Sequence, residues 1–249
     1  MKSFVFRFVS VALICASQAA MAEMTVIAID YNAQTLERHI QSTRVLGEIL
    51  GQSERAESLV SLYKTKTQDT LDRVTAAGPT GKKIYVELAQ KGPDEIGNSY
   101  GRGMWAGVIN LVGGHNIAEG QIGNWGPLSA EYIISQQPDI VLLAGSEWVN
   151  QPHSVQMGFA ASDERAQERL SSYAKRPGWE SFPAVQNKAM YGIYHGGNRT
   201  LSDFVYVRAI AKALYPQAFT DVDPAQELLD YYNEWMPIDA DGLFVTQLK

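Results

Sequence analysis

The stretch from Ser129 to Gly145, SAEYIISQQPDIVLLAG, places one helix and one strand in direct succession. Ser129 is a favourable N-cap residue for a helix that we expect to end at Gln136. Pro138-Asp139 stops that helix, and the apolar run from Ile140 to Ala144 has the length of a buried strand. A helix that leads at once into a buried strand predicts a parallel sheet covered by helices.

The same alternation continues on both sides of this stretch. Further strands are predicted at Ile84 to Ala89 and at Met190 to Tyr194. Further helices are predicted at Met104 to Val112, Asp163 to Tyr173, Ser202 to Leu214 and Pro224 to Trp235. Strands that alternate with helices indicate the α/β class, so we expect residues 79–249 to form one Rossmann-like lobe with a mostly parallel sheet.

A different pattern precedes this lobe. The short apolar run from Thr25 to Asp30, TVIAID, predicts a buried strand. Residues 33–78 have helical periodicity with an interruption at Gly51, which predicts one long helix or two nearly continuous ones. Gly78-Pro79 ends this helical region.

The N-terminus has the three parts of a secretory signal. Lys2 and Arg7 precede an apolar run, and Ala20-Met21-Ala22 has the small residues that a signal peptidase requires. We therefore expect a cleaved signal at residues 1–22 and a periplasmic protein that begins at Glu23. A membrane anchor fits less well because a spanning helix needs about 20 apolar residues. A lipoprotein attached at Cys15 also fits less well because bulky Ile14 precedes that cysteine.

Composition excludes several classes of function. Cys15 is the only cysteine, so the predicted mature chain has no disulfide and no thiol chemistry. The net charge of -6 becomes -8 once Lys2 and Arg7 are removed, which argues against nucleic-acid binding. The sequence contains no HExxH metal motif and no GxSxG nucleophile motif. We therefore predict that the chain is not an enzyme, with a periplasmic hydrolase or oxidoreductase as the alternative.

The glycine-rich loop from Gly92 to Gly107, GPDEIGNSYGRGMWAG, carries Tyr100, Arg102 and Trp105. Its Gly101-x-Gly103-x-x-Ala106 matches a dinucleotide fingerprint in form only, because that motif must directly follow a strand. A loop that faces a ligand is the better interpretation, and an ordinary loop folded onto the core is the alternative.

Polar and aromatic residues also follow the other two strands. The carboxyl ends of parallel strands meet at one edge of a sheet, where ligands of α/β proteins bind. We therefore expect one ligand-facing rim made of Tyr100, Arg102, Trp148, Tyr194, His195 and Arg199. Aromatic rings and guanidinium groups suit an anionic aromatic chelate. For His195 and Arg199 the alternatives are a surface histidine in a glycine turn and a partner for the following helix.

Five segments in order resemble the periplasmic binding proteins for ferric siderophores, haem and cobalamin. They are IAIDYNAQTLERHIQSTRVLGEILG (27–51), WAGVINLVGGHNIAEG (105–120), GPLSAEYIISQQPDIVLLAG (126–145), RPGWESFPAVQNKAMYGI (176–193) and residues 213–244. Members of that family have two α/β lobes joined by one long helix and hold their ligand between the lobes. The resemblance implies a solute-binding component of an ABC importer that delivers a ferric siderophore to an inner-membrane permease, with no cofactor of its own.

The resemblance also implies a domain plan and a docking residue. Residues 23–32 correspond to the last strand of the first lobe and residues 33–78 to the linking helix, so we expect most of the N-terminal lobe to be absent. Glu131 matches a surface glutamate with which such proteins dock on the importer, and an ordinary exposed carboxylate is the alternative.

The identity of the ligand stays open at the level of sequence. Arg102 and Arg199 favour an anionic siderophore over cobalamin, and haem or a nickel chelate bound through His195 remain alternatives. A half-protein that contacts a partner without binding any ligand is a further alternative.

Overall fold

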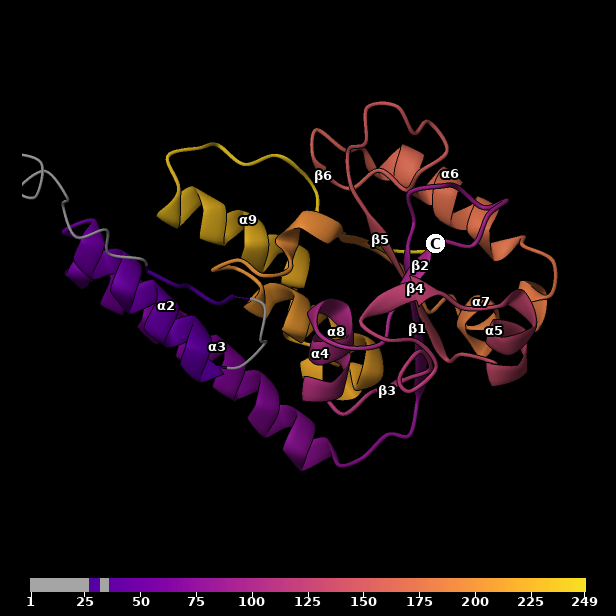
Figure 1. The fold of residues 1–249 in the computed structure, drawn as a ribbon, viewed down its shortest axis with the longest axis horizontal. Coiled ribbons are helices and arrows are strands. Elements are labelled where there is room, and N and C mark those ends of the chain that lie inside the picture. The colour runs from indigo at the N-terminus through magenta and orange to yellow at the C-terminus, as the bar shows by residue number, and fades with distance from the viewer. Residues whose placement is uncertain (1–26, 32–35) are drawn as a thin grey trace, which may run out of the picture.

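The computed structural model describes residues 27–31 and 36–249, which form an α/β fold around a five-stranded sheet (Figure 1). The strand order is β3-β1-β5-β7-β9. The strands are β1 (Lys83–Leu88), β3 (His115–Asn116), β5 (Ile140–Gly145), β7 (Met190–Tyr194) and β9 (Val245–Gln247). Neighbouring strands are parallel except for β9, which pairs antiparallel with β7. The predicted mostly parallel sheet is confirmed.

Helices cover both faces of the sheet because the central strands are apolar on both sides. All six residues of β5 are buried. Ile140 and Leu142 face one core with α4 (Met104–Leu111), α8 (Phe204–Leu214) and α9 (Pro224–Trp235). Val141 and Leu143 face a second core with α5 (Ala130–Gln136), α6 (Asp163–Ala174) and α7 (Pro183–Gln186).

The predicted strands and helices of the lobe are confirmed to within two residues at their ends. The largest difference is at α8, which begins at Phe204 after the N-cap residue Asp203, two residues later than the predicted start at Ser202. Small elements were not predicted: the edge strands β3 and β9, the short helix α7, the antiparallel pairs β2–β4 and β6–β8, and three short 3₁₀ helices. Their bounds are β2 (Asn98–Tyr100), β4 (Trp125–Pro127), β6 (Gly158–Phe159), β8 (Gly242–Leu243), η1 (Trp179–Ser181), η2 (His195–Gly197) and η3 (Pro216–Phe219).

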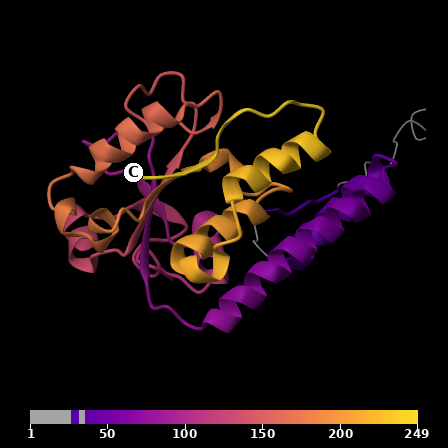
Figure 2. The ribbon, with the colours of Figure 1, turned by 180° about the vertical axis from the view of Figure 1, so that it is seen from behind.

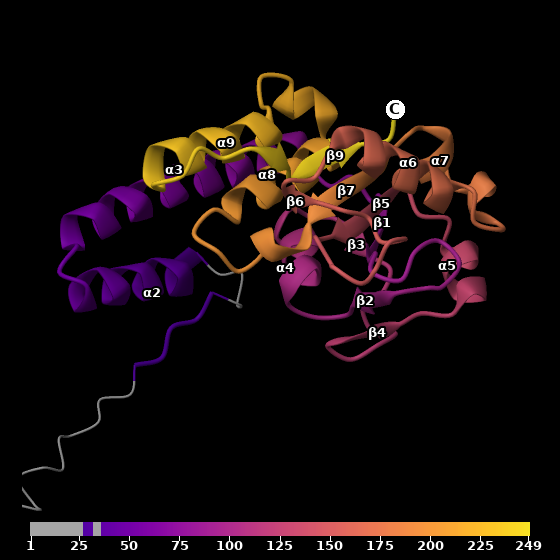
Figure 3. The same ribbon diagram turned by 90° about the horizontal axis from the view of Figure 1, so that it is seen from above.

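The helical region before the lobe folds into an antiparallel hairpin (Figure 3). It consists of α2 (Leu36–Ile49) and α3 (Ser53–Ala77). Gly51 has φ +64°, the left-handed conformation that glycine adopts without strain, and the chain reverses there. Arg44 of α2 pairs with Glu57 of α3 at 2.6 Å across the hairpin. The structure therefore has two helices in this region, but they run antiparallel. The predicted arrangement, one long helix or two nearly continuous ones, is not observed.

The hairpin packs on the lobe through α3, which contacts α8 (Figure 2). Arg208 of α8 donates to Asp69 of α3 at 2.7 Å, and Arg73 of α3 donates to Asp221 at 2.6 Å. These charge-assisted bonds fix the hairpin against the helical face of the lobe.

Residues 27–31 do not form the predicted strand. Ile27 and Ile29 are exposed, and no described strand pairs with this segment. The segment instead lies along α2, where the Asp30 N–H donates to Ser42 Oγ at 2.8 Å and Arg38 donates to the Asp30 carboxylate at 2.8 Å. The predicted signal at 1–22, with Cys15, lies outside the described residues. Among the helices that the structure describes, none combines the length and apolarity needed to cross a bilayer.

Candidate functional site

The carboxyl ends of β1, β5 and β7 lie at one edge of the sheet because these strands are parallel. β2 follows β1, Trp148 follows β5 and His195 follows β7, and β2 pairs antiparallel with β4. This topology brings loop residues that are distant in sequence to one place.

His195 is the centre of this cluster. The Trp105 indole Nε1 donates to His195 Nδ1 at 3.4 Å, and the Tyr100 hydroxyl lies 3.5 Å from the same nitrogen. The Trp148 ring centroid is 6.5 Å from that of His195, with the planes tilted by 36°. The structure therefore brings Tyr100, Trp148 and His195 together, as the strand pattern predicted.

A cavity of about 460 Å³ opens beside His195. It is lined by Leu88, Tyr100, Arg102, Gly103, Met104, Asn124, Trp125 and His195. Trp125 is 60% exposed, so its ring offers a large aromatic surface at this cavity. The cavity thus joins an aromatic wall to an exposed guanidinium, that of Arg102.

Arg199 brings a second positive charge to this edge. It is exposed and has φ +65°, a left-handed backbone that a non-glycine residue adopts only at some cost. Its charge acts on both Tyr100 and His195, where it lowers the pKa of each group.

Burial sets the protonation of the two central groups. Burial lowers the pKa of the His195 imidazole, and the Arg199 charge lowers it further, so His195 is neutral at neutral pH. Burial raises the pKa of the Tyr100 hydroxyl, and Arg199 only partly opposes this effect. The site therefore combines neutral hydrogen-bonding groups with two permanent cations.

Tyr194 does not join the cluster. Its ring packs against Phe244 and Phe159, with centroid distances of 5.6 and 6.4 Å. Tyr194 is the last residue of β7 and is not among the residues that line the cavity beside His195. Glu131 lies in the first turn of α5, where it is exposed. A carboxylate there also suits the positive end of the helix dipole.

Sequence reasoning missed Asn124 and Trp125 at the cavity. Asn124 directly precedes β4, and Trp125 is the first residue of that strand. Because β4 pairs with β2, Trp125 lies opposite Tyr100. The only local signal was a single tryptophan in a glycine-rich stretch. Trp105 stood out in the sequence as part of the loop, and the structure shows it fully buried and bonded to His195.

A buried ion pair holds the loop that leads from β1 to Tyr100. Arg176 donates to both oxygens of Glu87, at 2.6 and 2.8 Å, and also to the carbonyls of Gly92, Pro93 and Glu95. Glu87 in turn accepts the N–H of Gly97 at 2.9 Å. The loop is therefore fixed at several points along its main chain before it enters β2.

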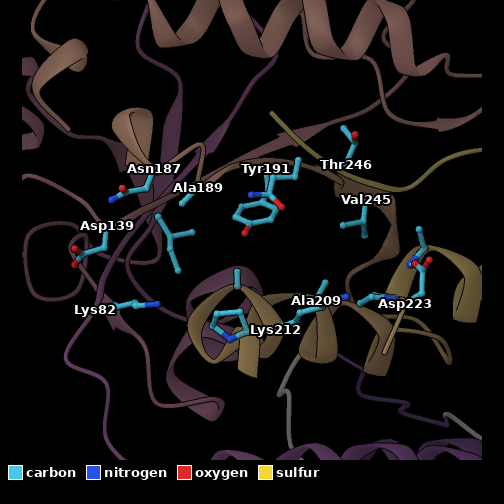
Figure 4. A pocket seen from close by; sticks show the side chains of 16 residues that line it. Lys82, Asp139, Asn187, Ala189, Tyr191, Ala209, Lys212, Asp223, Val245 and Thr246 are labelled. Atoms are coloured by element: carbon cyan, nitrogen blue, oxygen red, sulfur yellow. The ribbon is translucent and has the colours of Figure 1, made fainter. Parts of the chain in front are cut away.

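A second cavity, of about 530 Å³, lies at the opposite, amino-terminal edge of the sheet (Figure 4). The Tyr191 ring points into its middle, with Lys82 and Asp139 at one end and Asp223 at the other. These charged groups already bind main chain: Lys82 donates to Leu214 O, Asp139 accepts the Lys83 N–H, and Asp223 caps α9. They are committed to the fold, so the His195 cavity is the better candidate for an anionic ligand.

Over residues 27–31 and 36–249, no group of three or more His, Cys, Asp or Glu side chains is placed to hold a metal ion.

Comparison with known proteins agrees with this architecture. The family model for periplasmic binding proteins matches residues 16–194. The uncharacterized ABC transporter substrate-binding lipoprotein YvrC of Bacillus subtilis (strain 168) is 21% identical over 207 residues, 80% of this chain. That match spans only 57% of the length of the lipoprotein.

Solved structures share the fold. The TroA-like periplasmic binding protein FepB from Veillonella parvula superposes with a TM-score of 0.87 at 31% identity, over 94% of this chain and 67% of that chain. A periplasmic haem-binding protein from Pseudomonas aeruginosa superposes with a TM-score of 0.61 at 17% identity, over 94% of this chain and 72% of that one. At that lower identity the likeness concerns the fold alone.

Proposed function

The chain belongs to the periplasmic binding protein family, and from this membership we propose that it binds a metal chelate and delivers it to an ABC importer. The family is one of substrate-binding transport proteins, so the proposal contains no catalytic step. Family membership is also consistent with an extracytoplasmic location, and we propose that the signal at residues 1–22 directs it there.

The observation that carries this proposal is the cavity beside His195. Tyr100, Trp125 and Trp148 offer aromatic surface, and Arg102 and Arg199 offer positive charge at the same edge. Flat aromatic ligand arms stack on such rings, and guanidinium groups bind carboxylate or catecholate oxygens. A ferric siderophore combines both features, which favours it over cobalamin, whose periphery is mostly neutral amides.

Relatives support the chelate class at a coarser level. The similar structures include the periplasmic binding protein FepB and two periplasmic haem-binding proteins. Haem is therefore the main competing ligand for this site.

We further propose that Glu131 contacts the permease. It is exposed at the start of α5, where the side chain is free to pair with a basic residue of a partner. A single surface charge contributes little energy by itself, so its effect should appear in delivery and not in the affinity for the chelate.

Tryptophan fluorescence tests the proposed ligand class. The purified chain is titrated with a ferric tris-catecholate, a ferric trihydroxamate, haem and cobalamin. Saturable quenching by one ferric siderophore at micromolar concentration or below is the expected result. Trp125→Phe and Trp148→Phe should reduce the quenching. Trp179→Phe is the matched control, because Trp179 is buried in the other core. A folded chain that none of the four ligands quenches would overturn the proposal.

A further inference from the structure

The proton on His195 can be placed from its neighbours. The indole nitrogen of Trp105 can only donate a hydrogen bond, and it donates to His195 Nδ1 at 3.4 Å. Trp105 is fully buried and packs edge-on against Tyr206 with a centroid distance of 5.6 Å, so the indole cannot turn away. Nδ1 must therefore present its lone pair, and a neutral imidazole then carries its proton on Nε2.

The other ring nitrogen, Nε2, is open to solvent. His195 lines the cavity and is only partly buried. Among the described residues Nε2 has no hydrogen-bond partner, and it is not among the buried unpaired atoms. An N–H that is open to solvent without a protein acceptor is available to a ligand.

Tyr100 is constrained in the same way. Its hydroxyl lies 3.5 Å from His195 Nδ1, where a lone pair already faces Trp105, so the phenol also acts as a donor there. Burial raises its pKa, which keeps it a neutral phenol and not a phenolate. Tyr100 thus offers a neutral phenol and not the anionic phenolate that binds metal ions strongly, and the Nδ1 lone pair of His195 is shared by two donors.

We propose that His195 recognises the chelate as a hydrogen-bond donor through Nε2–H and does not ligate the metal. Arg102 and Arg199 at the same edge are donors as well, so both permanent charges and the His195 N–H can meet anionic oxygens of the ligand. Such a site fits a chelate whose metal is already fully coordinated and whose surface carries anionic oxygens. This inference rests on the proposed function and narrows it to the coordinatively saturated anionic class.

The inference disfavours ligands that need an axial protein ligand. To bind the metal of haem or of an open nickel complex through Nε2, His195 would have to move its proton to Nδ1. That proton would then face the Trp105 N–H, and a buried donor would lose its acceptor. Haem should therefore show the same absorption spectrum with the unmodified chain and with His195→Ala.

Nitrogen NMR tests the proton position directly. A long-range ¹H–¹⁵N correlation spectrum of the ¹⁵N-labelled chain distinguishes a protonated from an unprotonated ring nitrogen, and the spectrum of His195→Gln assigns the signals. At neutral pH we expect a protonated Nε2 and an unprotonated Nδ1, both without ligand and with a gallium(III) tris-catecholate as a diamagnetic probe. A proton on Nδ1, or loss of the Nε2 proton on binding the probe, would overturn the inference.

Two variants test the donor role by affinity. His195→Gln keeps an N–H donor and should bind the gallium probe within about threefold of the unmodified chain, whereas His195→Leu should weaken binding about tenfold or more. Equal losses in both variants would contradict a donor role. Failure of every chelate to bind the unmodified chain would overturn the proposed function, whereas binding with a proton on Nδ1 would overturn only this inference.

Discussion

The Tyr63 hydroxyl of α3 donates a 2.8 Å hydrogen bond to Asp203, the N-cap residue of α8, which follows Arg199 by four residues. His39 of α2 stacks on the Tyr63 ring with a centroid distance of 3.6 Å, and its Nε2 lies 2.8 Å from the Thr200 carbonyl. The helical hairpin therefore holds the far end of the loop that starts at His195. This contact links the N-terminal helices to the candidate site.

The two titratable groups of this contact have opposite effects on stability. Burial raises the pKa of Asp203 from 3.8 to about 7, so between these values the folded chain holds a proton that the unfolded chain has lost. Stability due to Asp203 then falls as the pH rises. Burial lowers the pKa of His39 from 6.5 to about 4, so between these values only the unfolded chain is protonated. Stability due to His39 rises with pH, and the two contributions oppose each other where their ranges overlap.

Asp203→Asn should remove the contribution of Asp203 to the pH dependence of stability and leave that of His39. The difference in unfolding free energy, variant minus unmodified chain, should increase between pH 4 and pH 6.5, by at most about 1.4 kcal/mol per pH unit. Urea denaturation at several pH values within this range measures it. His39→Gln is the mirror control, for which the corresponding difference should decrease. Parallel curves for all three proteins would show that neither group titrates as described.

Replacing only one partner of the Arg176–Glu87 ion pair should strongly lower the free energy of unfolding. Arg176→Met leaves the Glu87 carboxylate, which is 0% exposed, without its cation, so we expect a loss of about 3–5 kcal/mol in unfolding free energy. Glu87→Gln in the same chain should restore much of that loss, because the uncompensated charge is gone. Chemical denaturation provides the measurement. Arg44→Ala, which breaks the exposed pair with Glu57, should change stability little. Equal losses from the Arg176 and Arg44 variants would contradict this account.

The three longer strands of the lobe were predictable because β1, β5 and β7 are short apolar runs between turn residues, the pattern and length of a buried strand. Their parallel order then placed Trp148 and His195 at one edge. The position of Trp125 was not predictable, because it depends on the pairing of β2 with β4, two three-residue strands separated by 24 residues of chain (101–124).

The reversal at Gly51 was also beyond a local reading of the sequence. Apolar residues recur with the same spacing in one continuous helix and in two antiparallel helices. Only the contacts between α2 and α3 distinguish these two arrangements. Gly47 is the residue where those contacts are closest, since a Cβ there would lie 2.3 Å from the Cβ of Ala56. A Cβ at this distance would force α2 and α3 apart.

Gly47→Ala should therefore destabilise the chain although alanine favours helices. We expect a loss of about 1–3 kcal/mol from overpacking, measured by chemical denaturation. Ala56→Gly in the same chain should relieve the contact and recover part of the loss. Gly126→Ala is the control, because a Cβ at Gly126 meets no atom within 4 Å. A Gly47→Ala chain as stable as the control would mean that α2 and α3 do not pack as closely as described.

The two arginines at this edge of the sheet, Arg102 beside the cavity and Arg199 near His195, should contribute to affinity through charge. Arg102 and Arg199 are both exposed, so replacing them with Gln should leave the fold intact while it removes two positive charges from the site. We expect the double variant to bind an anionic ferric siderophore at least about tenfold more weakly, equivalent to about 1.4 kcal/mol. The loss should shrink at high salt because mobile ions screen exposed charges. Fluorescence titration at two salt concentrations measures both effects.

Arg165→Gln on α6 is the control variant. It removes an exposed charge from the other face of the sheet and should leave the affinity for the chelate unchanged. Equal affinity of the double variant and of this control for the chelate would mean that other groups bind the anionic ligand. That result would contradict the assignment of the ligand site to the cavity beside His195.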